Sequence, residues 1–118
     1  MNNEVKKKIT EIVCKAWNEL DASLLESILS DDFEYISVWV LETMKGKENY
    51  IDYLKGKFDA IKKTGNKVDA GIVFQSKIDE YVVAIGQDGI RDAALQIWAK
   101  GGKITHMWMR PIDLVGLK

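Results

Sequence analysis

The chain has 118 residues, of which 47% are hydrophobic and 30% charged, and its formal net charge at pH 7 is -1. This composition predicts one soluble globular domain, residues 1–118, and the near-neutral charge argues against a nucleic-acid-binding protein, which needs a clustered basic surface. The single cysteine, Cys14, excludes an intrachain disulfide and a cysteine metal cluster. No signal-peptide core and no apolar run long enough to span a membrane is present, so we expect a cytoplasmic protein.

The first two elements are predicted to be helices. Apolar residues of "VKKKITEIVCKAW" recur at helical spacing, which predicts a helix over residues 3–19. Asp21 or Ser23 can cap a short second helix, and Ser23 with Glu26 fits a capping box. Asp31-Asp32 is expected to follow its end. The apolar face of this second helix would be Leu24, Leu25, Ile28 and Leu29.

The middle of the chain changes from a strand pattern to a helical one. Residues 33–45 are rich in aromatic and β-branched types, which predicts one or two extended segments with a bulge or turn near 38–41. Residues 47–63 then predict a long helix that ends at Gly65. Its predicted apolar face is Tyr50, Ile51, Leu54, Phe58 and Ile61. The lysines at 55, 57, 62, 63 and 67 are interpreted as a solvated surface.

After Gly65 the pattern has period two. Strands are predicted over residues 67–77, 81–87, 93–100 and 103–109. Asp88-Gly89 and Gly101-Gly102 are hairpin signals, and Arg91 and Asp92 are assigned to the turn before the third of these strands. Four strands with short turns predict an antiparallel meander. Both of its faces are apolar, so we expect the helices to cover one face and a second subunit to cover the other.

The order and spacing of three segments resemble the nuclear transport factor 2-like superfamily, with its ketosteroid-isomerase-like and SnoaL-like members. These segments are "AWNELDASLLESILSDDFEYIS", "MKGKENYIDYLKGKF" and "GGKITHMWMRPID". The resemblance implies an α+β, cystatin-like fold in which a curved antiparallel sheet forms a cone around a long helix, with two helices at the N-terminus. It also implies a pocket for a small apolar or aromatic ligand at the open end of the cone, and a homodimer formed through the outer face of the sheet.

The resemblance allows one activity, that of ketosteroid isomerases, to be checked against the residues at the corresponding positions. Ketosteroid isomerases use a helix tyrosine and a strand aspartate as base. Aligned from Asp31-Asp32, the strand position falls on Ser37 and the helix position on or near Val13. Serine is not a base at neutral pH and valine donates no hydrogen bond, so we do not expect this activity. The opposing acid of those enzymes would fall within "DAALQIWA", where no residue was assigned.

His106 is the one histidine, and therefore the one candidate for a catalytic base with a reference pKa near neutrality; a structural role is the alternative. Ile104, His106 and Trp108 are expected to share one strand face. Arg110 could bind a carboxylate or phosphate, or pair with Asp113. Glu34 and Glu42 are expected to be exposed. The predicted pocket residues, for which core packing is the alternative, are Trp17, Tyr35, Ser37, Trp39, Tyr50, Trp98, His106, Trp108 and Arg110.

Two functions are compatible with the sequence. One is a homodimeric small-molecule-binding protein, which includes the case of a cofactor-independent lyase or isomerase acting on an aromatic or polyketide-like compound. The other is a non-catalytic dimeric protein-interaction module that uses a sheet face. The sequence contains no second histidine and no cysteine pair, so we expect no metal site, and it contains no glycine-rich phosphate loop, so we expect no cofactor.

Overall fold

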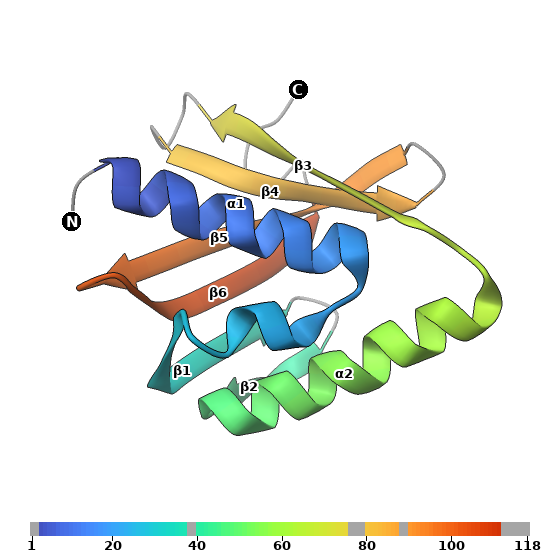
Figure 1. Cartoon of the computed structure of the whole chain (residues 1–118), viewed down its shortest axis with the longest axis horizontal. Helices are drawn as coiled ribbons and strands as arrows, with labels where there is room; N and C mark the ends of the chain where they lie inside the picture. The colour runs from blue at the N-terminus through green and yellow to red at the C-terminus, as the bar shows by residue number, and fades with distance from the viewer. Residues whose placement is uncertain (1–2, 38–39, 76–79, 88–89, 112–118) are drawn as a thin grey trace.

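The computed structural model describes residues 3–37, 40–75, 80–87 and 90–111. The elements are α1 (Asn3–Glu19), the single 3-10 turn η1 (Ala22–Leu25), β1 (Leu29–Ser37), β2 (Val40–Lys45), α2 (Lys47–Thr64), β3 (Val68–Gln75), β4 (Glu80–Gln87), β5 (Ile90–Lys100) and β6 (Lys103–Pro111). Figure 1 shows them as one curved sheet with both helices on the same side, an α+β architecture.

The six strands form one sheet in the order β2-β1-β6-β5-β4-β3. The predicted antiparallel meander of the last four strands is confirmed. The stretch 33–45 contributes two strands that pair antiparallel to each other. β1 then lies parallel to β6, which no local pattern indicated. This pairing joins the N-terminal hairpin to the meander in one sheet that has β2 and β3 at its edges.

The two helices divide the concave face of the sheet between them. α1 packs mainly against β3 and β4, whereas α2 packs against β1 and β2 (Figure 1). The sheet therefore curves around both helices. The core is continuous across both halves, because α1, α2 and five of the strands contribute buried side chains to one cluster.

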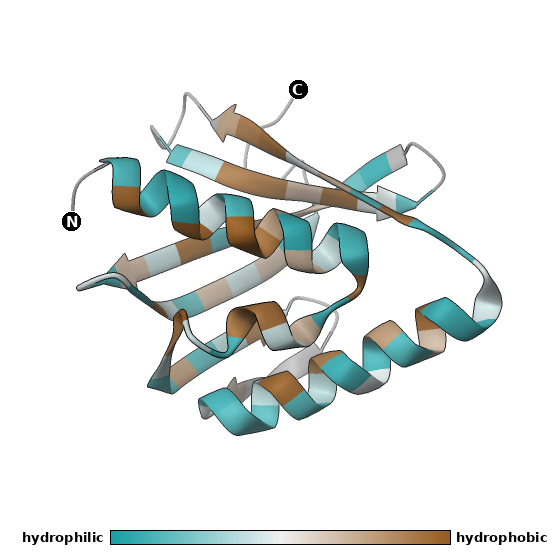
Figure 2. Ribbon diagram, viewed as in Figure 1, coloured by the Kyte–Doolittle hydropathy of each residue, from teal (hydrophilic) through white to brown (hydrophobic). Residues whose placement is uncertain are grey.

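Amphipathic patterning explains why each helix lies where it does. Hydrophobic and hydrophilic residues alternate along α1 and α2 in Figure 2, and the hydrophobic residues are the buried ones. α2 begins and ends at glycines with positive φ: Gly46 at +96° and Gly65 at +76°. The Gly46 amide donates to the carbonyl of Phe33 over 2.7 Å, so the chain turns from β2 into α2 directly beside β1.

The second helix is shorter than predicted. Asp21 is the cap, with its side chain accepting a hydrogen bond from the backbone amide of Ser23 over 3.0 Å, but the helix is one 3-10 turn that ends at Leu25. β1 already begins at Leu29, so Asp31-Asp32 lies inside a strand and not in a connector. The reason is tertiary: the Ile28 carbonyl accepts a hydrogen bond from the amide of Ile104 in β6, which draws this segment into the sheet.

The start of β5 also differs from the prediction. β5 begins at Ile90, so Arg91 and Asp92 lie within the strand and not in the preceding turn. Arg91 donates two hydrogen bonds to the carboxylate of Asp69 on β3, over 3.0 and 3.2 Å. This bidentate contact bridges across β4 and helps fix the first residues of β5 in the sheet. The hairpin signal at residues 88–89 lies outside the described residues.

His106 and Trp108 share one face of β6, as predicted, but the prediction that Ile104 lies on that face was wrong, because the strand contains a bulge. His106 is opposite Trp98 but Ile104 is opposite Ala99, so Thr105 has no partner of its own on β5. An extra residue reverses the alternation of side chains. Ile104 consequently points into the core and is fully buried, whereas His106 is exposed on the outer face. The Gly101-Gly102 turn before this strand is confirmed, with φ values of +60° and +81°.

Candidate ligand-binding pocket

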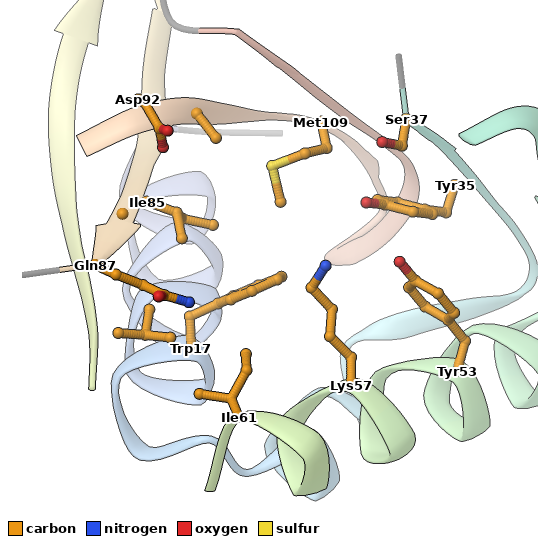
Figure 3. A pocket seen from close by; sticks show the side chains of 13 residues that line it. Trp17, Tyr35, Ser37, Tyr53, Lys57, Ile61, Ile85, Gln87, Asp92 and Met109 are labelled. Carbon is orange, nitrogen blue, oxygen red and sulfur yellow. The ribbon is translucent and has the colours of Figure 1, made fainter. Parts of the chain in front are cut away.

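A pocket of about 470 Å³ opens between α1, α2 and the concave face of the sheet. Figure 3 shows its lining side chains converging from these three sides. The lining residues are Trp17, Tyr35, Ser37, Tyr53, Lys57, Ile61, Val68, Ile85, Gly86, Gln87, Asp92, Ala93 and Met109. The inner walls are buried and mostly apolar or aromatic, and the polar side chains Lys57, Gln87 and Asp92 are exposed at the rim.

Trp17, on the last turns of α1, has the largest side chain of the residues that line the pocket. Its ring packs edge-on against Phe58 of α2, with centroids 5.0 Å apart, and only 3% of the residue is exposed. The neighbouring Asn18 holds β3 beside α1: its amide nitrogen donates to the carbonyl of Ala70 over 2.9 Å and its oxygen accepts from the Ala70 amide over 2.8 Å. Trp17 and Val68, which precede these two residues in α1 and β3, both line the pocket.

β1 contributes Tyr35 and Ser37, which lie two residues apart and therefore on one face of the strand. Tyr35 contacts the rings of Tyr50 and Tyr53, at centroid distances of 4.8 and 6.0 Å. Burial raises the pKa of Tyr35 well above its usual value; the nearby Tyr53 adds to this shift and a hydrogen bond with Ser37 opposes it. The phenol of Tyr35 is therefore protonated at neutral pH.

α2 contributes Tyr53, Lys57 and Ile61, spaced four residues apart on one stripe of the helix. In Figure 3 the side chain of Lys57 extends from α2 with its ammonium group directed into the cavity, on the same side as the hydroxyls of Tyr53 and Tyr35. Lys57 is exposed, as predicted for the lysines of this helix, and it also borders the pocket.

The opposite side of the pocket carries the acidic group. Ile85 pairs with Ala93 and Gly86 with Arg91, so Asp92 is an extra residue in β5, a β-bulge. Bulges re-aim side chains, and here both Asp92 and its neighbour Ala93 line the pocket. Gln87, at the end of β4, lies on the same side as Asp92 in Figure 3.

These groups define what the pocket can do. One side offers a buried phenol, a second phenol and an ammonium; the other offers a carboxylate and an amide. Between them lies an aromatic surface formed by Trp17 and extended by Met109. Such a site can hold a planar apolar molecule and place hydrogen-bond donors at one end of it. In the described part of the chain, no three histidine, cysteine, aspartate or glutamate side chains gather in a way that could hold a metal ion.

Three of the predicted pocket residues, Trp17, Tyr35 and Ser37, do line this pocket. Tyr50 lies behind them, fully buried in the core between Phe33 and Tyr35, and is not part of the lining. Trp39 lies outside the described residues, and the side chain of Glu42 also lies outside the description. Val13, the position compared with an isomerase tyrosine, is fully buried in the core.

The remaining predicted residues lie on the outer face of the sheet, away from the pocket. Trp98, His106 and Trp108 line a shallow hollow of about 310 Å³ together with Ile36 and Met107. The indole rings of Trp98 and Trp108 are 6.4 Å apart. The guanidinium carbon of Arg110 lies 4.2 Å from the centre of the Trp108 ring, and burial lowers the pKa of this arginine. His106 lies 3.5 Å from the half-buried carboxylate of Glu34. The bulge at Thr105 places His106 and Trp108 on the face of β6 opposite Ile104.

Sequence reasoning missed the other lining residues for identifiable reasons. The spacing of Tyr53, Lys57 and Ile61 was readable as a second stripe on α2, adjacent to its apolar face. Met109 follows Met107 at a strand period of two, and both are buried. Asp92 had no local signal, because the bulge that directs it into the pocket exists only when β4 and β5 pair.

Comparison with solved structures identifies the fold. A SnoaL-like protein of unknown function from Burkholderia thailandensis superposes with a TM-score of 0.71 at 14% identity, over 94% of this chain and 98% of the other. A Jannaschia protein named for its likeness to SnoaL polyketide cyclases gives 0.67 at 13% identity, over 97% and 92% of the two chains. An epoxide hydrolase from M. tuberculosis gives 0.62 at 15% identity, over 94% and 85%.

The protein therefore has the nuclear transport factor 2-like fold, as the sequence indicated. At these identities the likeness establishes the architecture and leaves the activity open, because this fold carries many unrelated functions. No protein-family model matches the sequence. No curated protein matches it either. Within the described residues, no helix is long and apolar enough to cross a membrane.

Proposed function

We propose that this protein binds a small, largely planar aromatic molecule in the pocket between α1 and α2. The observation that carries the proposal is the lining itself: buried aromatic and apolar walls with a few polar groups at the rim. The volume of about 470 Å³ falls within the range of about 300–1,000 Å³ that is usual for small-molecule sites. Trp17 supports the same proposal, because its buried aromatic ring forms part of the pocket wall.

The test is ligand binding measured by thermal shift and titration calorimetry over a panel of mono- and bicyclic aromatic compounds. Ile61→Phe is the blocking variant, since Ile61 is half-buried at the rim and a larger ring there fills the cavity. Ile72→Phe is the matched control, because Ile72 is 38% exposed and does not line the pocket. We expect compounds that stabilise the wild type to lose affinity for Ile61→Phe alone. A panel in which nothing binds the wild type, or in which both variants bind equally well, would reject the proposal.

The pocket also has the groups that a cofactor-independent lyase or isomerase needs. Tyr35 is a hydrogen-bond donor that can polarise a carbonyl, and Asp92 is a carboxylate that can accept a proton from carbon. Binding of an aromatic ketone such as 2-tetralone allows this chemistry to be measured as exchange of its α-protons with D₂O. We expect faster exchange with the wild type than with Asp92→Asn or Tyr35→Phe, while both variants still bind the ketone. Equal exchange rates in all three proteins would reject this catalysis and would leave ligand binding as the proposed function.

The outer face of the sheet supports a second proposal, that the chain forms a homodimer. Trp98 is 37% exposed beside Trp108, and the same face carries acidic Glu34 and basic Arg110. A two-fold axis through this face would cover the tryptophans and could bring opposite charges of the two copies together. If no compound of the panel binds in the pocket, this face supports the alternative function, a dimeric protein-interaction module.

Sedimentation equilibrium tests the dimer. We expect a dimer for the wild type and a monomer for Trp98→Glu. Tyr81→Glu is the control, because Tyr81 is 50% exposed but packs on Phe74, remote from the tryptophan hollow. A monomeric wild type, or a Trp98→Glu variant that remains dimeric, contradicts the proposed interface.

A further inference from the structure

We propose that the pocket selects ligands that carry a single carboxylate on an aromatic framework, and that Lys57 is the counter-ion of this carboxylate. This inference rests on the proposed function, since it names the class of ligand for the same pocket. The evidence is the placement of Lys57, the nature of the hydrogen-bonding groups around it, and the position of Asp92.

Lys57 differs from the other lysines of its helix. Of the described residues that line the pocket, it is the one with a cationic side chain, and its ammonium is directed into the cavity (Figure 3). Lys55 lies 3.7 Å from the carboxylate of Glu26, and Lys62 and Lys63 lie in the last turn of α2, where cations favour the helix end. In the described structure no carboxylate forms an ion pair with Lys57, so the ammonium is available to an anion from outside the chain.

The groups on the same side of the pocket as Lys57 are hydrogen-bond donors. Tyr35 stays protonated because it is buried, and the hydroxyl of Tyr53 points into the cavity beside it (Figure 3). A carboxylate has only acceptor oxygens, and each of them can receive more than one such bond. The donor set is therefore complementary to a carboxylate.

Asp92 sets the direction in which the ligand binds. Its carboxylate lies on the side of the pocket opposite Lys57 and Tyr53 (Figure 3). Like charges repel, so an anionic group at that end is disfavoured, and a second carboxylate on the ligand would meet Asp92. The inferred ligand is thus a monoanion, with its charged end at Lys57, its ring against Trp17 and Met109, and a neutral or hydrogen-donating end toward Asp92.

The experiment compares 2-naphthoate with 2-naphthamide, two probes of nearly equal shape that differ in charge. Binding of each is measured by titration calorimetry to the wild type, Lys57→Met, Lys57→Arg and Lys63→Met. Lys63 is the matched control because it lies on the same helix, is exposed and does not line the pocket. Each titration is repeated at low and high NaCl, because salt screens an exposed ion pair but leaves a neutral contact unchanged.

We expect the wild type and Lys63→Met to prefer naphthoate, with a preference that declines as salt increases. Lys57→Met should bind naphthoate about 5- to 30-fold more weakly, the range between a rim ion pair and a charge-assisted hydrogen bond, and should bind naphthamide as before. Lys57→Arg should retain the preference. Equal affinity of the wild type for both probes, or an unchanged preference in Lys57→Met, would overturn the inference while leaving the proposed pocket intact. A wild type that binds neither probe overturns it too, and whether the pocket itself survives is then decided by the wider panel and the Ile61→Phe variant.

Discussion

Replacing Tyr50 by phenylalanine tests how the core beneath the pocket is built. Tyr50 is fully buried, and its hydroxyl has no hydrogen-bond partner in the described structure. A buried hydroxyl without a partner costs about 1–3 kcal/mol. Tyr50→Phe removes this cost and keeps the ring contacts with Phe33 and Tyr35, at 4.9 and 4.8 Å. The space of one oxygen atom left behind costs only about 0.2 kcal/mol at about 24 cal/mol per Å³.

The expected result is therefore a more stable protein. The free energy of unfolding should rise by about 1 kcal/mol, which corresponds to an increase in Tm of about 4 °C for a domain of this size. Urea titration followed by circular dichroism measures the first quantity and calorimetry the second. Tyr53→Phe is the control, because Tyr53 is only half-buried and its hydroxyl faces the pocket, so its loss should leave stability nearly unchanged. A Tyr50→Phe variant that loses 1 kcal/mol or more would show that the hydroxyl is bonded, and would refute the reasoning.

The same tyrosine gives a pH dependence with a definite sign. Burial raises the pKa of both Tyr35 and Tyr50 above their ordinary value of 10.0. The folded protein then holds these protons when the unfolded chain releases them, so stability is complete below pH 10 and falls as the pH rises above it. The slope is about 1.4 kcal/mol per pH unit for each tyrosine. Tyr50→Phe should halve the slope that is due to this pair, as measured by urea titration from pH 9 to 11.

Two further substitutions test local features. Gly65 ends α2 at a φ of +76°, so Gly65→Ala should lower the free energy of unfolding by about 1 kcal/mol. Gly56 lies inside α2 with open space around it, so Gly56→Ala should raise the free energy of unfolding by about 0.5–1 kcal/mol. Changes of the same sign in urea titration would contradict this assignment. Asp21 caps η1 through Ser23, and this hydrogen bond lowers its pKa, so the contribution of the cap is present above pH 4 and lost as the carboxylate is protonated. Asp21→Ala should accordingly reduce Tm at pH 7 and have little effect at pH 2, and an equal reduction at both would show that the carboxylate charge is not involved.

Most elements of the fold could be predicted from the sequence, because their signals are local. The exceptions were the extent of η1 and the starts of β1 and β5. Helical spacing located α1 and α2, and Gly46 and Gly65 fixed the ends of α2 through backbone angles that other residues rarely adopt. Period-two alternation and Gly101-Gly102 located the meander. These signals need only the chain and its immediate neighbours, and their order was sufficient to indicate the nuclear transport factor 2-like fold.

The full set of side chains that meet in the pocket could not be predicted from the sequence, because it depends on how the strands pair and how the helices pack on them. His106 and Arg110 were predicted to line the pocket but lie on the outer face, beyond a bulge in β6. Asp92 was assigned to a turn but lies at the pocket rim, because it is the extra residue of a bulge in β5. A bulge depends on how two strands align. One extra residue reverses the face to which every following side chain points, and the local sequence pattern does not indicate where this occurs. Likewise, the sequence does not distinguish Lys57 from the other surface lysines of α2. Its ammonium borders the cavity because α2 packs on β1.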